Sequence, residues 1–129
     1  MITKYVDVDD GKWGIVIVYD YDMTERDRLW AIMDSFGMES RNISKSLRIL
    51  SEPNTGMAIS RDDIRMSAIF ISNTTEDSEF YSTLAHELAH VKSAIVDYYQ
   101  EGYRGEPYAY LSGYLMKRAI EEIGQYPCE

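Results

Sequence analysis

The sequence predicts an α+β fold in which a small mixed or antiparallel sheet packs on a long helix and a C-terminal helix. Two observations predict this fold. Short runs rich in β-branched and aromatic residues occur in the first half of the chain, and apolar side chains recur at helical spacing in several other segments. The chain has 129 residues, of which 45% are hydrophobic and 27% charged. These values are typical of one folded domain, which we expect to span 1–129.

A strand and then a helix are expected near the N-terminus. The run 12–19 is rich in Trp, Ile, Val and Tyr, which predicts a strand. Thr24 is a candidate N-cap for the helix that follows, because its hydroxyl can accept from a backbone N–H of the first turn. Met33 and Phe36 lie at helical spacing in this segment, and Gly37 is a natural end for the helix.

The middle of the chain predicts a short amphipathic helix followed by a β-hairpin. The helix covers about 42–51, where apolar residues recur at helical spacing at Ile43, Leu47 and Leu50. The cluster Pro-Asn-Thr-Gly at 53–56 is a strong turn signal. Two β-like runs follow it, at 57–61 and 64–72, and predict the two strands of the hairpin.

The longest predicted helix covers about 77–101 and opens at Thr75 or Asp77. Its apolar residues are separated by steps of three or four, so they form one stripe that faces the core. The stripe consists of Phe80, Leu84, Leu88, Val91 and Ile95, with Tyr98 or Tyr99 at its end.

A glycine-containing turn separates this helix from a last one. Gly102 and Gly105 interrupt the helical pattern. Pro107 suits the first turn of a helix, and the pattern then continues to about Ile123.

The charge balance excludes several classes of partner. The chain has 13 Lys and Arg against 22 Asp and Glu, a formal net charge of −9, so we expect it to bind neither nucleic acid nor an anionic membrane. The apolar run 15–18 is too short for a signal peptide or a membrane span. Cys128 is the one cysteine and has no intramolecular disulfide partner. A reducing, cytoplasmic location is therefore expected.

An H-E-x-x-H motif lies within the long predicted helix, where residues 86–90 are His-Glu-Leu-Ala-His. Residues four apart in an α-helix lie about 40° apart around the axis and about one turn along it. The imidazoles of His86 and His90 can therefore close on one ion of the size of Zn²⁺. Glu87 projects beside them, as a general base for a zinc-activated water must.

The helical angles separate the motif from the core. At about 100° per residue from Phe80, the core stripe falls at roughly 0–80°. His86 then falls near ~240° and His90 near ~280°, both away from the stripe, whereas Glu87 falls near ~340°, at its edge. We therefore expect exposed histidines beside a glutamate that borders the core.

A catalytic zinc site needs a third protein ligand. No other histidine exists and Cys128 lies at the C-terminus, so we expect an Asp or a Glu. Asp97 and Glu101 share the histidine face, but they lie two turns or more beyond His90, roughly 10 Å or further along the axis. That distance excludes them as direct ligands, although Asp97 could orient a neighbouring group.

Glu106 is the better candidate for the third ligand. The turn before it lets the last helix fold back antiparallel on the long helix that carries the histidines. The small residues Ala109 and Gly113 continue its stripe and would permit a close approach of the two helices. An alternative stays open, since Pro107 disfavours α geometry at Glu106. In that case Glu106 is an N-cap whose charge stabilises the helix N-terminus.

The residues at 83–90, Thr-Leu-Ala-His-Glu-Leu-Ala-His, and at 105–111, Gly-Glu-Pro-Tyr-Ala-Tyr-Leu, together resemble the zincin metallopeptidases of the glutamate type, the gluzincins. In particular, they resemble small metallopeptidases of bacteria, phage and mobile elements, and ImmA/IrrE-type proteases are similar in plan. The resemblance covers about 83–113. It implies a minimal zincin-like domain in which His86, His90 and Glu106 hold Zn²⁺ and Glu87 is the catalytic base.

The same resemblance implies a peptide or protein substrate whose peptide bond is hydrolysed. It also implies a sheet edge, expected at 66–72, that pairs with the extended substrate. Tyr110 departs from the pattern, because many gluzincins carry an Asp at that place. The last helix also lacks a histidine to stabilise the oxyanion, which leaves as candidates Tyr103, Tyr108, Tyr110, Tyr114 and Arg104.

Two alternatives to a peptidase stay open. The small size and acidic charge of the chain also fit a zinc-binding regulatory or interaction protein without hydrolytic activity. A protein that binds no metal is the third possibility, in which the histidines are ordinary surface residues.

Overall fold

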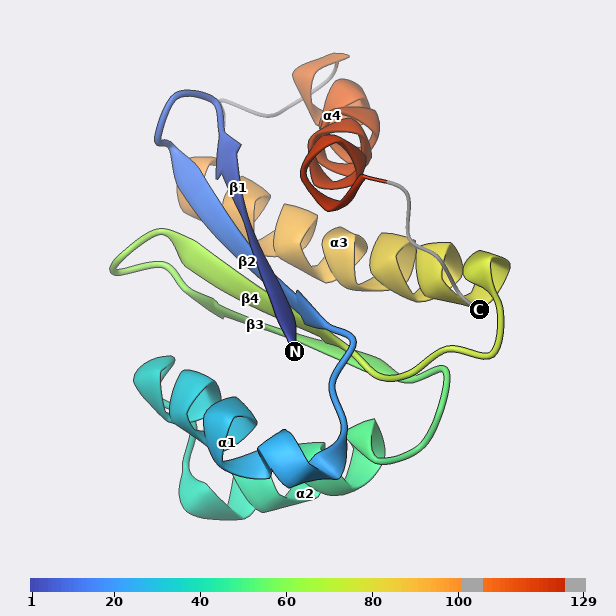
Figure 1. Ribbon diagram of the computed structural model, residues 1–129. Coiled ribbons are helices and arrows are strands. Elements are labelled where there is room, and N and C mark those ends of the chain that lie inside the picture. The colour runs from blue at the N-terminus through green and yellow to red at the C-terminus, as the bar shows by residue number, and fades with distance from the viewer. Residues whose placement is uncertain (101–105, 125–129) are drawn as a thin grey trace.

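The computed structural model describes residues 1–100 and 106–124, with the side chains of Glu106 and Pro107 left out. It confirms the α+β class: a four-stranded sheet is covered by helices on both faces (Figure 1). The strands are β1 (Ile2–Val8), β2 (Trp13–Tyr19), β3 (Gly56–Arg61) and β4 (Met66–Ile71). The helices are α1 (Arg26–Ser35), α2 (Ser40–Leu50), α3 (Asp77–Tyr99) and α4 (Glu106–Ile123), with a 3₁₀ turn, η1 (Met23–Glu25), before α1.

The sheet is mixed and has the strand order β1-β2-β4-β3. β1 pairs with β2 and β3 with β4 in antiparallel register, whereas β2 and β4 pair in parallel. The chain leaves β2, passes through α1 and α2, and returns to the sheet as the hairpin β3–β4. The predicted hairpin is thereby confirmed.

The predicted edge at 66–72 is wrong, because β4 lies in the interior of the sheet between β2 and β3. Five of its six residues are buried, as both faces of an interior strand are. The parallel pairing of β4 with β2 is a contact between distant segments, which the local pattern of 64–72 does not contain. The edge next to this hairpin is formed by β3.

The sheet separates two hydrophobic cores. α1 and α2 cover one face, where Leu29, Met33, Ile43 and Leu47 pack on Val18, Ala68 and Phe70. α3 and α4 cover the other face, where the apolar stripe of α3 packs on the alternate residues of the strands, among them Ile15, Ile17, Ile69 and Ile71. Figure 1 shows the two helical layers on opposite sides of the sheet. The period-two alternation of the strands supplies both cores.

Two local expectations near the N-terminus need correction. β1 was not predicted; its burial alternates, with Thr3 and Tyr5 exposed and Val6 and Val8 buried. The N-cap of the first helical segment is Asp22 rather than Thr24, because the Asp22 carboxylate accepts from the backbone N–H of Thr24 at 2.8 Å. Aspartate accepts in this position as readily as threonine.

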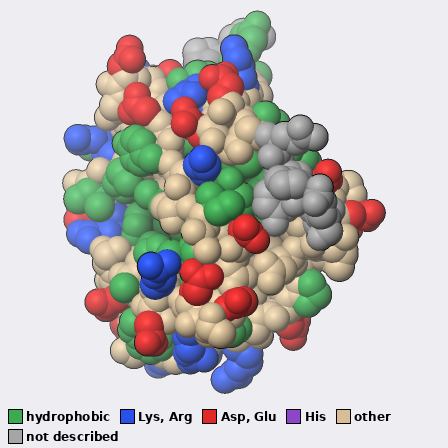
Figure 2. Space-filling model, in the orientation of Figure 1, with side chains coloured by type: hydrophobic (Ala, Val, Ile, Leu, Met, Phe, Trp, Pro, Cys, Tyr) green, Lys and Arg blue, Asp and Glu red, His purple; other side chains and the backbone are tan. Residues whose placement is uncertain are grey.

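The surface carries mixed charges. On the face drawn in Figure 2, Lys and Arg side chains are scattered among Asp and Glu side chains rather than gathered into one patch. Among the helices that the structure describes, none has the length and apolar character needed to cross a membrane.

Candidate metal centre

Helix α3 positions the three residues of the motif. Its buried residues, Phe80, Leu84, Leu88, Val91 and Ile95, form the stripe that the spacing predicts, and they anchor the helix on the sheet. His86 and His90 are exposed, whereas Glu87 is only 4% exposed. The predicted faces are therefore confirmed: the histidines lie away from the core, and the glutamate lies at its border.

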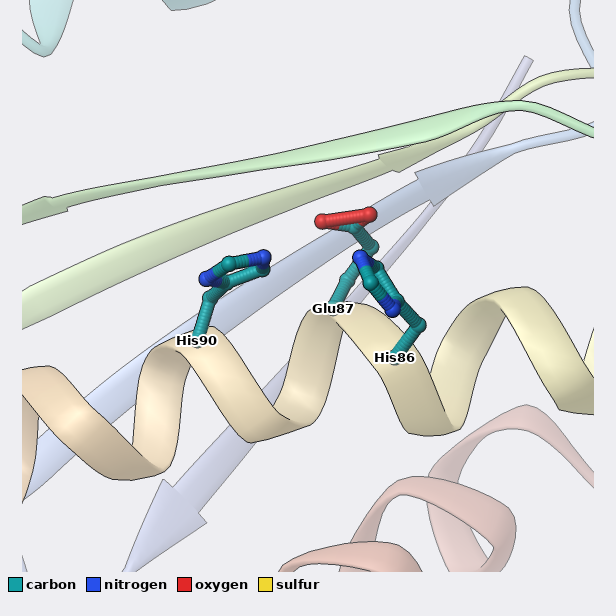
Figure 3. A group of neighbouring side chains, drawn as sticks. All are labelled: His86, Glu87 and His90. Carbon is teal, nitrogen blue, oxygen red and sulfur yellow. The ribbon is translucent and has the colours of Figure 1, made fainter.

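The three side chains converge on one point (Figure 3). The ligand atoms that His86, Glu87 and His90 can offer all lie within 4.8 Å of one another. The imidazole rings of the two histidines are 5.1 Å apart between centroids and nearly perpendicular, at 78°. Zn²⁺ binds histidine nitrogen at about 2.0–2.1 Å, so its nitrogen ligands lie roughly 3–4 Å from one another. The separation of the potential ligand atoms, at most 4.8 Å, is close to this range, and the group could hold a metal ion.

Burial changes the acidity of Glu87. The loss of water around the carboxylate raises the pKa of Glu87, and this effect outweighs the favourable charges of His86 and His90, which lower it. A carboxylate with a raised pKa is a stronger base than one in water. Burial is thus the dominant influence on the acidity of Glu87.

Gly56, the first residue of β3, packs directly against the motif. A Cβ atom on Gly56 would lie 2.6 Å from Cγ2 of Thr83 and 3.1–3.2 Å from Cγ and Oε2 of Glu87. Only a glycine therefore lets the strand approach α3 this closely. The predicted turn at 53–56 ends on this residue, but the contact with Glu87 carries no signal in the local sequence.

Two hollows flank the motif, and both are lined by Gly56, His86 and Glu87. The first has a volume of about 560 Å³ and extends along β3 toward Ser60, Ala94 and Asp97. The second, of about 420 Å³, extends in the other direction toward Asn54, Thr55, Glu79 and Ser82. The motif thus lies at the junction of two open spaces between α3 and the strand β3.

A hydrogen-bonded chain fixes the wall of the first hollow. The buried indole Nε1–H of Trp13 donates to the hydroxyl of Ser67 at 2.9 Å, and this hydroxyl lies 2.6 Å from that of Ser60. Because the Trp13 N–H can only donate, Ser67 accepts from it, and either serine hydroxyl can donate to the other.

The third ligand, Glu106, stays a prediction. The helix α4 begins at Glu106, but its side chain lies outside the described residues. The expected close approach through Ala109 and Gly113 is wrong: both are exposed, and a Cβ on Gly113 would meet nothing within 4 Å. They line a separate hollow beside Asp9.

α4 instead contacts α3 on another side of that helix. Lys92 donates to the hydroxyl of Ser112 at 2.9 Å and lies 3.7 Å above the ring of Tyr108. The core-facing side of α4 is its apolar row Leu111, Leu115, Ala119 and Ile123. Large apolar side chains thus set the rotation of α4, and the small residues point outward.

The described tyrosines of α4 make contacts away from the histidines. Tyr108 lies beneath Lys92, and the hydroxyl of Tyr114 accepts from the backbone N–H of Asp9 at 3.2 Å. Tyr110 is 72% exposed and lines the same hollow as Tyr114. Tyr103 and Arg104 lie outside the described residues, as does Cys128.

Two acidic residues belong to the hollows. Asp97, which the sequence analysis excluded as a direct ligand, lines the first hollow, and Glu79, which it did not consider, lines the second. The signal that could have identified Glu79 is its spacing. It precedes His86 by seven residues, as Asp97 follows His90 by seven, and seven residues are close to two helical turns.

Comparison with known proteins adds no relative: no protein-family model, curated protein or solved structure matches this chain. The geometry itself therefore carries the functional argument. Among the residues that the structure describes, His86, Glu87 and His90 form a group that could hold a metal ion.

Proposed function

We propose that this protein is a zinc-dependent peptidase that uses His86, His90 and Glu106 as metal ligands and Glu87 as general base. The observation that carries the proposal is the convergence of His86, Glu87 and His90 at the junction of two hollows beside the edge strand β3. Nitrogen and carboxylate ligands match the chemistry of Zn²⁺. A surface pair of histidines without such a function needs neither the buried glutamate nor the open space.

Glu87 moves the proton in the proposed reaction. When bound, zinc supplies Lewis acidity: it polarises the scissile carbonyl and lowers the pKa of its water toward ~7. The carboxylate of Glu87 would take the proton of the attacking water and pass it to the nitrogen of the leaving amine. The burial of Glu87 supports this role, because it raises the pKa of the carboxyl.

The edge strand β3 supplies a place for the peptide. Ser72 N–H donates to Thr55 C=O at 2.9 Å, so the pair 55/72 is hydrogen-bonded. Because hydrogen-bonded pairs alternate along an antiparallel ladder, the backbone groups of Gly56, Ala58 and Ser60 point away from β4. An extended peptide can add to this edge as a further strand. Its backbone would then run past the histidines.

Metal content is the first test. We expect purified wild-type protein, never exposed to chelator, to carry one zinc ion per chain. His86→Ala should lose that zinc, and Glu106→Gln should weaken zinc binding, whereas Glu52→Gln, an exposed change of the same type, should leave it unchanged. Equal zinc in wild type and His86→Ala would remove the metal centre from the proposal.

Hydrolysis is the second test. Zinc-loaded wild type and Glu87→Gln are incubated with a mixture of peptides of defined sequence, and new termini are identified by mass spectrometry. We expect cleavage by the wild type and a loss of at least ~100-fold in Glu87→Gln, the scale of general-base catalysis. Full turnover by Glu87→Gln would refute the base assignment. Stoichiometric zinc with no cleavage of any peptide would instead favour a regulatory zinc-binding protein.

A further inference from the structure

We propose that the two hollows are acidic side-chain subsites and that the substrate is an extended segment with Lys or Arg on both sides of the scissile bond. This inference rests on the proposed function and specifies its substrate class. It depends on four features: the positions of Glu79 and Asp97, the linings of the hollows, the unfavourable place of Asp97 in α3, and the course of β3.

Glu79 and Asp97 lie on the same face of α3 as the two histidines. Each is seven residues from the nearer histidine, which places it about 10 Å further along the helix axis. That distance is too long for a metal ligand. However, each of these residues lines a hollow that His86 and Glu87 also line, so a group bound near the histidines can extend toward it.

The linings of the two hollows fit long basic side chains. Ala58 and Ala94 contribute apolar surface to the first hollow, which Asp97 also lines. Ile49 and Thr83 offer apolar surface in the second, before Glu79. No Lys or Arg occurs among the described residues that line either hollow. A hollow that offers both apolar contact and an acidic residue, with no basic residue beside it, suits the alkyl stem and charged end of Lys or Arg.

Asp97 occupies an unfavourable place for helix stability. It lies near the C-terminal end of α3, where the helix dipole is negative and a basic residue would be preferred. The last turn of α3 contains no basic residue. A residue that opposes the local electrostatic rule, in a hollow that leads to the candidate metal centre, is better explained by binding than by folding.

The strand β3 would guide the substrate from the motif toward Asp97, and residues 54–55, which precede the strand, line the hollow of Glu79. Gly56 lies against Thr83 and Glu87, and four residues later Ser60 lines the same hollow as Asp97, so β3 and α3 run in the same general direction. Each carboxylate belongs to a residue about 13 Å along the helix from the midpoint of the histidines. An extended chain advances ~3.3 Å per residue. A basic residue two or three positions from the bond can therefore reach each acid.

The test uses three fluorescent peptides of equal length. Each carries Lys, Gln or Glu at the second and third positions on both sides of a central bond. Binding to zinc-loaded wild-type protein is measured by fluorescence anisotropy, and cleavage by mass spectrometry. We expect the Lys peptide to bind about threefold to fivefold more tightly than the Gln peptide for each carboxylate that it reaches. The Glu peptide should bind most weakly.

Charge-neutral variants assign the preference to the two residues. Glu79→Gln and Asp97→Asn should each reduce the preference for Lys about threefold to fivefold. The matched control Asp34→Asn removes one negative charge on α1, which lies across the sheet, and should leave the preference unchanged. Zinc content, measured in every variant, shows whether the metal centre is intact.

The outcomes separate this inference from the proposed function. Equal binding of the three peptides, no binding of any peptide, or a preference that survives in the Glu79→Gln/Asp97→Asn double variant would each overturn the acidic subsites. Equal cleavage of the Lys, Gln and Glu peptides would support the proposed peptidase activity and refute the acidic subsites. Selective binding of the Lys peptide without cleavage would retain the subsites and reject the peptidase.

Discussion

The two faces of the sheet differ in what they bury. On the face covered by α1 and α2, the core consists of apolar side chains, and the hydroxyl of Tyr21 is a buried polar atom with no hydrogen-bond partner among the described residues. On the face covered by α3, the buried set includes the charged Glu87 and the hydroxyl of Ser67, and two hollows open beside them. The same strands thus support a closely packed face and a face with polar groups and open space.

Under the proposed function, one small sheet would serve stability on one face and chemistry on the other. A buried carboxylate has an energetic cost unless something compensates its charge. Packing on the α1/α2 face contributes stability that does not depend on the motif. The predictions below test how independent the two faces are.

The largest expected effect is on stability, from one leucine on each face. Leu47→Ala on α2 and Leu84→Ala on α3 remove side chains that are at most 1% exposed, so each should lower the unfolding free energy by about 2–5 kcal/mol. Only Leu84→Ala should also weaken zinc binding, because Leu84 anchors the helix that carries the histidines. Urea unfolding and a zinc titration of the folded fraction measure the two effects. Equal zinc affinities in the two variants would contradict the proposed independence of the faces.

The next effect concerns the contact between β3 and α3. Gly56→Ala should cost about 1–3 kcal/mol, because its Cβ would lie 2.6 Å from Cγ2 of Thr83. Thr83→Ser removes that methyl group, so the double variant should recover part of the loss. Gly113→Ala is the matched control: its Cβ meets nothing, and it should stabilise α4 by up to about 1 kcal/mol. Thermal or urea unfolding of the wild type, the two single variants at Gly56 and Thr83, and the double variant gives a double-mutant cycle. If the losses of stability in the two single variants simply add in the double variant, the contact is ruled out.

A smaller effect is expected from the buried tyrosine of the other face. Tyr21→Phe removes a hydroxyl whose burial raises its pKa and for which the described residues provide no hydrogen bond. We expect the variant to be more stable by about 1 kcal/mol, with zinc binding unchanged. A loss of stability in urea unfolding would show that the hydroxyl has a partner, such as a bound water.

The smallest expected effect is a change in the pH dependence of stability. The pKa of Glu87 is raised on folding, so the metal-free folded state binds a proton more readily than the unfolded chain. Stability should therefore fall as the pH rises from the ordinary glutamate pKa of about 4.5 through the raised value, whereas below about 4.5 the contribution of Glu87 should be constant. Glu87→Gln should lack this contribution. The unfolding free energy of the metal-free wild type and of metal-free Glu87→Gln is measured between pH 4 and 7. If the two free energies change with pH in the same way, the raised pKa of Glu87 is contradicted.

Much of the candidate site could be predicted because it lies on one helix. The spacing of the apolar residues in α3 fixes the rotation of the helix, and this rotation exposes His86 and His90 while Glu87 borders the core. Residues four apart on a helix are neighbours whatever the rest of the fold does. The histidine geometry therefore follows from local sequence alone.

The parts of the site from other elements were not predictable in this way. The edge was expected at 66–72, but β3 forms it, since the pairing of β4 with β2 depends on segments about fifty residues apart. The stripe of Ala109 and Gly113 was expected against α3, but the apolar row of α4 dictates a different rotation. Both errors concern long-range packing.

The sequence by itself determined the helices, the strands other than β1, and the histidine–glutamate motif, because helical periodicity and residue chemistry act over a few neighbouring residues. Three features depended on the tertiary structure alone. β3, rather than β4, lies at the edge of the sheet, and only a glycine fits at position 56. Glu79 and Asp97 line hollows on either side of the motif. These features arise from contacts between residues that are far apart in the chain. Such contacts depend on the order of the strands and on the packing of whole helices.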